Sequence, residues 1–216
     1  MKIAIAISLF LACAVGSSQR PFYTVINGNT DADDLPTSGA KVCLTSNGSC
    51  FQMPDSQNGG VTYQFGLDPH VKVLPQTGTS PWLLFDATFS GGGSGTLTRY
   101  AILRTSESGW SNLLPKVALT NVSDYALWTQ PGFSPYPLFI TADFLWDFKA
   151  GEAHFSKHAF TVDVWRYEQG KDTYTQVITY RTNKKYDGGD SADTVSVIAP
   201  ERNEILHRLA ALKAKP

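Results

Sequence analysis

Charge of either sign is scarce in this chain. Only 17% of the 216 residues are charged, and 18 Lys and Arg residues face 19 Asp and Glu residues, which gives a formal net charge of −1. Proteins bind nucleic-acid backbones through clustered Lys and Arg, and here the only small basic cluster is the pair Lys184 and Lys185. We therefore expect no nucleic acid as a main partner.

Long hydrophobic runs are lacking as well. The apolar run from Ile3 to Ala12 is shorter than the roughly 18 to 20 residues that a membrane-spanning helix needs, so no transmembrane segment is expected. Lys2, this run and the small residues after it follow the order of a secretory signal peptide. We predict a signal peptide over residues 1–14 and an exported chain, periplasmic or secreted, from residue 15. The alternative is a lipid anchor on Cys13, although Leu11 is bulkier than that signal usually has two residues earlier.

Cysteine is rare, with three residues in the whole chain. Removal of the signal peptide leaves Cys43 and Cys50, which flank a turn rich in Ser, Asn and Gly. An even pair in an exported chain favours one disulfide across a local hairpin. Two unpaired thiols are the alternative.

Helical periodicity is lacking until the end of the chain. Alternating apolar and polar residues, rich in β-branched and aromatic types and separated by Gly, Pro, Asn and Asp, recur instead. This pattern predicts an all-β fold, an antiparallel sandwich or meander of about ten to twelve strands in a single β-rich domain over residues 15–216. The expected strands are residues 22–26, 40–45, 61–65, 71–74, 82–89, 96–105, 117–121, 125–129, 138–148, 159–167, 174–182 and 194–198.

One C-terminal α-helix is expected over residues 200–213. Pro200 is a typical helix start, acidic residues follow in the first turns, and Lys213 lies at the end, where it suits the helix dipole. Ile205, Leu209 and their neighbours form an apolar stripe at helical spacing. We expect this stripe to cover an open face of the β structure.

Motifs of nucleophilic catalysis are also absent. No Gly-x-Ser-x-Gly elbow occurs, and the glycine-rich segment 90–95 has no Walker-type Lys and Ser or Thr after it. We read this segment as the tip of a hairpin between the strands expected at 82–89 and 96–105, in which glycine permits unusual backbone angles.

The segment 138–167 contains the main candidate sites. Its two alternating runs predict a large hairpin whose one face is core and whose other face is exposed. The predicted exposed face combines acidic and aromatic side chains. It makes a candidate binding surface of Asp143, Asp147, Asp163 and Trp165.

The loop at 149–158 between these runs contains Glu152, His154 and His158. Glu152, His154 and His158 form a candidate site for a divalent metal ion. Glu152 and His154 project to one side of a strand, whereas His154 and His158 are about 13 Å apart on a strand and meet only if the chain bends. The alternative interpretation is a pair of hydrogen-bonded loop histidines.

Three functions are compatible with these patterns. The first is an exported, non-catalytic binding or interaction protein of the cell envelope or extracellular space, with a glycan or envelope component as partner and no cofactor. The second is a metal-dependent hydrolase that uses the Glu/His cluster. The third is a structural accessory protein. The sequence indicates no oligomeric state and does not decide whether the chain is an enzyme.

Overall fold

The structure is a computed structural model that describes residues 22–58, 60–74, 80–90, 96–115, 118–120, 124–145, 147, 149, 153, 156–187 and 196–213. Within these residues it contains sixteen β-strands, all paired antiparallel, and one α-helix near the C-terminal end. The all-β antiparallel prediction is confirmed. The predicted signal peptide, with Cys13, lies outside the described residues.

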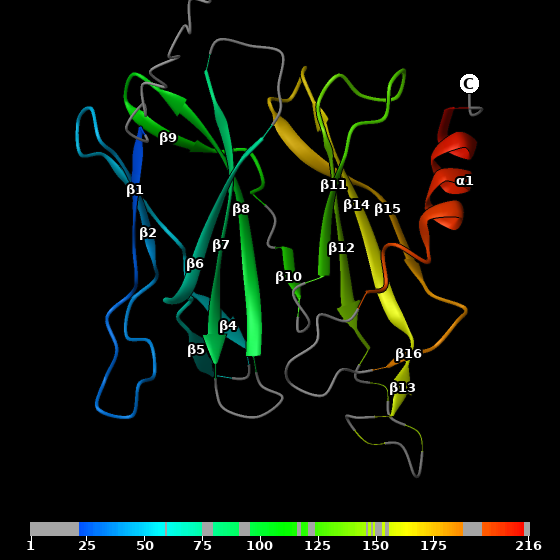
Figure 1. Ribbon diagram of the computed structural model, residues 1–216, viewed down its shortest axis with the longest axis horizontal. Coiled ribbons are helices and arrows are strands. Elements are labelled where there is room, and N and C mark those ends of the chain that lie inside the picture. The colour runs from blue at the N-terminus through cyan, green and yellow to red at the C-terminus, as the bar shows by residue number, and fades with distance from the viewer. Residues whose placement is uncertain are drawn as a thin grey trace, which may run out of the picture.

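Three sheets lie side by side from left to right in Figure 1, and the helix lies beyond the last of them as a fourth layer. The N-terminal sheet contains β1 (Tyr23–Ile26), β2 (Lys41–Leu44) and β3 (Cys50–Gln52) in that order. The central sheet has the order β10-β8-β7-β6, with β9 also on β8. Its strands are β6 (Leu67–Leu74), β7 (Trp82–Ser90), β8 (Thr96–Ser106), β9 (Gly109–Asn112) and β10 (Ala118–Thr120).

The C-terminal sheet has the order β11-β12-β14-β15. Its strands are β11 (Asp124–Trp128), β12 (Leu138–Phe144), β14 (Phe160–Glu168) and β15 (Thr173–Arg181). Two short ribbons complete the β structure: β4 (Ser56–Asn58) with β5 (Val61–Tyr63), and β13 (Lys157–His158) with β16 (Tyr186–Asp187). The helix α1 (Arg202–Lys213) follows.

Both predicted hairpins form. β7 pairs with β8 from Trp82 opposite Arg104 to Ser90 opposite Thr96, and β12 pairs with β14 from Phe139 opposite Trp165 to Phe144 opposite Phe160. The alternation of apolar and polar residues identified them because successive side chains in a strand point to opposite faces. β3, β4, β9, β13 and β16 have at most four residues each and were not predicted. The strand expected at 194–198 is absent from the part that the structure describes, 196–198.

Each interface between layers is a separate apolar cluster. Val42 of the N-terminal sheet and Met53, the residue after β3, pack against one face of the central sheet, where Phe85 and Leu103 lie. The other face of the central sheet packs against the C-terminal sheet through an aromatic cluster, whose members include Trp82, Tyr100, Phe139, Trp165, Tyr167 and Tyr174.

The far face of the C-terminal sheet is covered by α1. Ile205 and Leu209 are 0% and 3% exposed there and pack against Ile140 and Val164, among others. Two carboxylates join the start of the helix to the sheet: Asp124 on β11 accepts hydrogen bonds from the backbone N–H groups of Val197 (2.7 Å) and Ile198 (3.0 Å). Buried Glu201 accepts hydrogen bonds from two tyrosines of the β structure, Tyr180 and Tyr186. The predicted helical lid is therefore present.

The predicted disulfide joins Cys43 and Cys50, which lie directly opposite each other on β2 and β3. The turn between these strands has Gly48 at a φ of +71°, in the left-handed region that favours glycine. Asn47 stabilises the same turn, because its side-chain oxygen accepts a hydrogen bond from the Ser49 N–H at 2.9 Å.

Removal of this disulfide should destabilise the protein moderately. We expect the double variant Cys43→Ser, Cys50→Ser to lose about 2 to 3 kcal/mol of unfolding free energy, because the bond closes only a short loop in the unfolded chain. Urea denaturation of both proteins, with and without reductant, measures the effect. Reductant should lower the midpoint of the wild-type protein and leave the variant unchanged; equal midpoints without reductant would show that the bond contributes nothing.

Candidate functional site

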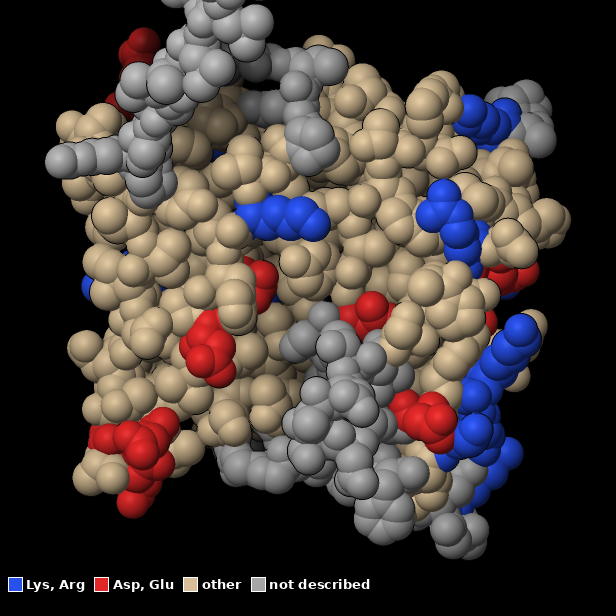
Figure 2. Space-filling view, viewed as in Figure 1, with Lys and Arg blue, Asp and Glu red and all other residues tan. Residues whose placement is uncertain are grey.

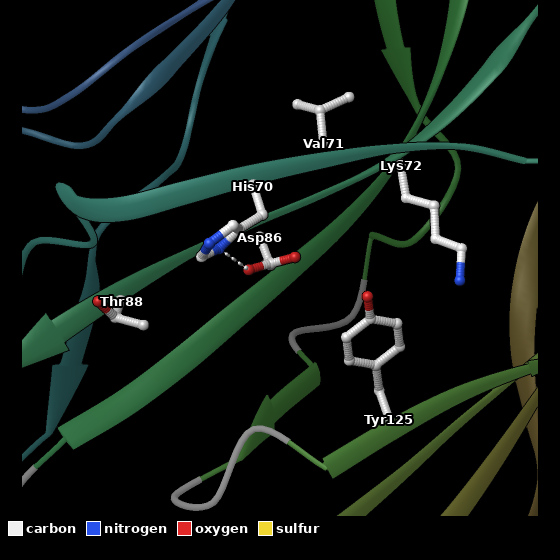
Figure 3. A pocket seen from close by; sticks show the side chains of 6 residues that line it. All are labelled: His70, Val71, Lys72, Asp86, Thr88 and Tyr125. Atoms are coloured by element: carbon white, nitrogen blue, oxygen red, sulfur yellow. Dashed lines mark hydrogen bonds and ion pairs between the residues drawn. The ribbon is translucent and has the colours of Figure 1, made fainter. Parts of the chain in front are cut away.

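A cleft of about 320 Å³ opens between the central and C-terminal sheets. We call it the inter-sheet cleft, and it is lined by His70, Val71, Lys72, Asp86, Thr88 and Tyr125. Ligand pockets in proteins begin at about 300 Å³, so the cleft has room for one small ring or a short chain. Figure 3 shows these side chains, which come from β6, β7 and β11.

Strand alternation places the polar groups in this cleft. His70 and Lys72 lie two residues apart on β6 and share the face that looks toward the C-terminal sheet, whereas Val71 between them points the other way (Figure 3). On β7, Asp86 is the single charged residue of the strand and lies directly opposite His70 in register. Thr88 follows two residues later on the same face.

The fourth polar group comes from the facing sheet. Tyr125 lies on β11, and its hydroxyl points toward β6 and β7 across the cleft (Figure 3). Burial, and then the negative charge of Asp86, raise the pKa of Tyr125 above its usual value. The phenol therefore stays protonated and can donate a hydrogen bond to a ligand.

His70 and Asp86 form a polar pair at the wall of the cleft. The His70 Nδ1 and the Asp86 Oδ1 are 3.3 Å apart, with the imidazole side chain 73% exposed and the carboxylate only 11% exposed. Burial raises the pKa of Asp86 from 3.8 to about 6, although the charge of His70 and the hydrogen bond to it oppose this shift. The pair leaves the His70 Nε2 directed away from Asp86 and open to a ligand.

A buried hydrogen bond lies beside this pair. Tyr100, the cross-strand neighbour of Asp86 on β8, is 2% exposed, and its hydroxyl lies 3.1 Å from the Oγ1 of Thr120 on β10. Burial is also the main cause that raises the pKa of Tyr100. Neutral groups therefore surround Asp86 on this side and give its negative charge little compensation.

The predicted binding surface of Asp143, Asp147, Asp163 and Trp165 does not form one exposed face. Trp165 is 3% exposed and packs in the aromatic cluster between the sheets, so the interpretation of it as an exposed ring is wrong. Its indole Nε1 has no hydrogen-bond partner among the described residues. The physical reason is that a second sheet covers the face that sequence alternation marked as exposed.

Each of the three aspartates of that prediction interacts with a different partner. Asp143 is half-buried, and its Oδ1 accepts a hydrogen bond from the Phe144 N–H at 2.9 Å. Asp163 accepts one from the Gln176 side chain at 2.6 Å. Asp147, beyond the end of β12, forms an ion pair with Arg181.

The predicted metal cluster lies partly outside the described residues, because these exclude Glu152 and His154. His158 is described and is 3% exposed. Its Nε2 donates a hydrogen bond to the Ala153 carbonyl at 2.8 Å, and its ring packs on Phe144. No group of three or more His, Cys, Asp or Glu side chains suited to a metal ion occurs in the described part of the chain. The metal site stays a prediction.

Sequence reasoning missed His70, Lys72 and Asp86. One signal was present, because Asp86 interrupts an otherwise uncharged, mostly apolar strand, and a charge at such a position needs a partner or a function. The partner could not be read from the chain, since His70 is sixteen residues away and meets Asp86 only through the register of β6 and β7.

On the face seen in Figure 2, charged side chains stand singly or in small groups separated by uncharged surface. No helix in the described residues is long and apolar enough to cross a membrane. Fold and cleft together define an antiparallel, β-sandwich-like protein with a small cleft between two of its sheets. Comparison of the chain with protein-family models, with curated proteins and with solved structures finds no match.

Proposed function

We propose that the protein is an exported binding protein that holds one unit of a glycan in the inter-sheet cleft. The observation that carries this proposal is the convergence of a tyrosine ring from one sheet with His70, Asp86 and Thr88 from the other, around a space of about 320 Å³. Few polar groups placed around a partly apolar cleft are typical of small-ligand sites.

The chemistry of the lining suits a sugar. A sugar ring has apolar C–H faces that pack against an aromatic ring, and hydroxyl groups at its edge that both donate and accept hydrogen bonds. Tyr125 provides the ring. Asp86 provides an acceptor, and so does the hydroxyl oxygen of Thr88, whose proton is donated to the Leu67 carbonyl at 3.1 Å. The free ring nitrogen of His70 can donate or accept, depending on its tautomer.

Export is part of the proposal and rests on two supports. The first residues have the order of a secretory signal peptide, and Cys43 is joined to Cys50 by a disulfide, a bond that persists in oxidising compartments. Polysaccharides are present in the cell envelope and outside the cell, where an exported protein could bind them in this cleft.

Two substitutions test the proposal. We expect a glycan array probed with the purified protein to retain it on a subset of saccharides, and titration calorimetry to show affinity lowered at least about tenfold by His70→Ala and by Tyr125→Leu, since each removes a direct contact worth about 1.4 kcal/mol or more. His207→Ala is the matched control, because that histidine is exposed on α1.

Two results would contradict the proposal. One is the absence of binding to every saccharide at millimolar concentration. The other is binding that both cleft substitutions leave unchanged, which would place the ligand elsewhere. Circular dichroism and thermal melting of each variant establish that the fold is intact before binding is compared.

A further inference from the structure

The inter-sheet cleft contains an ammonium group that has no ion-pair partner among the described residues. Lys72 is exposed and lines the cleft, and it makes no ion pair within the part of the chain that the structure describes. Several other basic side chains are paired, for example Arg104 with Asp172 and Lys171 with Glu168. Figure 3 shows the Lys72 side chain extending toward the same space as the Tyr125 hydroxyl.

Asp86 does not cancel the charge of Lys72, because it is paired with His70 at 3.3 Å. While Asp86 is protonated, Lys72 gives the cleft a positive charge. Burial raises the pKa of Asp86 to about 6. A rise in pH through this range therefore ionises Asp86, adds a negative charge to the cleft and weakens its attraction for an anion.

Other titratable groups near the cleft do not change this charge balance between Lys72 and Asp86. Tyr100 and Tyr125 are phenols whose pKa values are raised by burial, so both stay neutral. Asp124 on β11 is directed to the other face of its sheet, where it accepts the N–H groups of Val197 and Ile198. Asp143 on β12 shares the face of Tyr125 but is not part of the cleft lining.

We propose, on the basis of the glycan-binding function above, that the ligand is an acidic sugar whose negatively charged substituent pairs with Lys72 while its ring packs on Tyr125. The Nε2 of His70 binds a neighbouring hydroxyl group, and the hydroxyl oxygen of Thr88 accepts a hydrogen bond from another. A carboxylate or sulfate is bound more strongly than a hydroxyl, because a hydrogen bond between charged groups is about twice as strong as one between neutral groups.

The test compares one glycan in two charge states. Short oligomers of polygalacturonate and of the same chain with methyl-esterified carboxyl groups are titrated against the purified protein between pH 5 and 8, with a sulfated galactan as a second anionic probe. We expect the acidic oligomers to bind at least about tenfold more tightly than the esters at pH 5.5. Their affinity should fall as the pH rises, whereas the affinity of the esters should stay constant.

Lys72→Met should remove this preference, with about a tenfold loss for the acidic oligomer and less than about a twofold loss for the ester. Lys41→Met, at a lysine on β2 outside the cleft, should leave both affinities unchanged. Preference for the sulfated galactan over polygalacturonate would assign the substituent as sulfate and supports the same role for Lys72.

The inference and the proposed function fail in different ways. Equal binding of acidic and esterified oligomers, with no effect of Lys72→Met, would overturn the acidic-sugar inference and leave glycan binding in place. Binding of neither form, nor of any neutral saccharide, would overturn the proposed function and the inference with it.

Discussion

Replacement of Asp86 by asparagine is expected to make the protein more stable at neutral pH. The carboxyl group is 11% exposed, and burial raises its pKa from 3.8 to about 6. A carboxyl whose pKa is raised in the folded state binds its proton more tightly there than in the unfolded chain. The unfolding free energy therefore falls as the pH rises from about 3.8 to about 6, and the full loss of stability is present above pH 6.

The shift corresponds to about 3 kcal/mol at pH 7.5, since one pKa unit is 1.36 kcal/mol. Asparagine has the same shape as the protonated acid, can still accept a hydrogen bond from His70, and carries no charge. We expect the unfolding free energies of wild type and Asp86→Asn to be similar at pH 3.5 and to diverge by up to about 3 kcal/mol at pH 7.5. Urea denaturation at a series of pH values measures the difference.

Asp187→Asn serves as the control for this experiment. That carboxylate is 75% exposed and pairs with Lys157 at the surface, so its removal should change stability by less than about 0.5 kcal/mol. Loss of stability in Asp86→Asn at pH 7.5 would show that the charge of Asp86 stabilises the fold, and would contradict this prediction.

The loss of stability caused by the buried charge of Asp86 supports a functional role for the cleft. Functional sites often keep groups that reduce the stability of the fold, and perturbed carboxyls in clefts are typical of such sites. Asp86→Asn should also make glycan affinity depend less on pH, because the asparagine side chain, unlike the Asp86 carboxyl with its raised pKa, has no proton to lose in this range. A gain in stability with a loss of binding would separate a functional role from a structural one.

The fold could be predicted from local patterns where one strand contacts its neighbour in sequence. Alternation predicted the pairing of β7 with β8 and of β12 with β14, and the Ser, Asn and Gly turn predicted the Cys43–Cys50 hairpin. Alternation cannot predict how many faces of a sheet are covered. The C-terminal sheet is buried on both faces, and that is why Trp165 is core rather than surface.

The candidate site was not predicted for a related reason. His70, Asp86 and Tyr125 come from three strands in two sheets, and their meeting depends on register and on the packing of one sheet against another. The sequence instead suggested a metal site at His154 and His158, because these histidines are close together in the chain. The one that is described, His158, is buried beside Phe144 and hydrogen-bonded to backbone.

The helix α1 is expected to be an integral part of the cooperative fold, and Ile205→Ala tests this. Ile205 is fully buried in the cluster on the far face of the C-terminal sheet. Truncation removes apolar contacts and leaves a cavity, which costs about 2 to 5 kcal/mol for a buried isoleucine. We expect a loss of about 3 kcal/mol in urea denaturation with an unchanged slope, and a change of less than about 0.5 kcal/mol for the exposed control His207→Ala.

Binding and stability should separate in this variant, because α1 and the inter-sheet cleft lie on opposite faces of the same sheet. β11 connects them: Tyr125 points into the cleft, and the adjacent Asp124 holds the segment before the helix. The two Asp124 hydrogen bonds do not depend on Ile205, so β11 should keep its position and folded Ile205→Ala should bind glycan with wild-type affinity. A fall in stability smaller than about 1 kcal/mol would show that the helix packs loosely and opens alone. An affinity loss in the fully folded variant would instead show that helix packing positions Tyr125, and the cleft would then depend on the layer behind it.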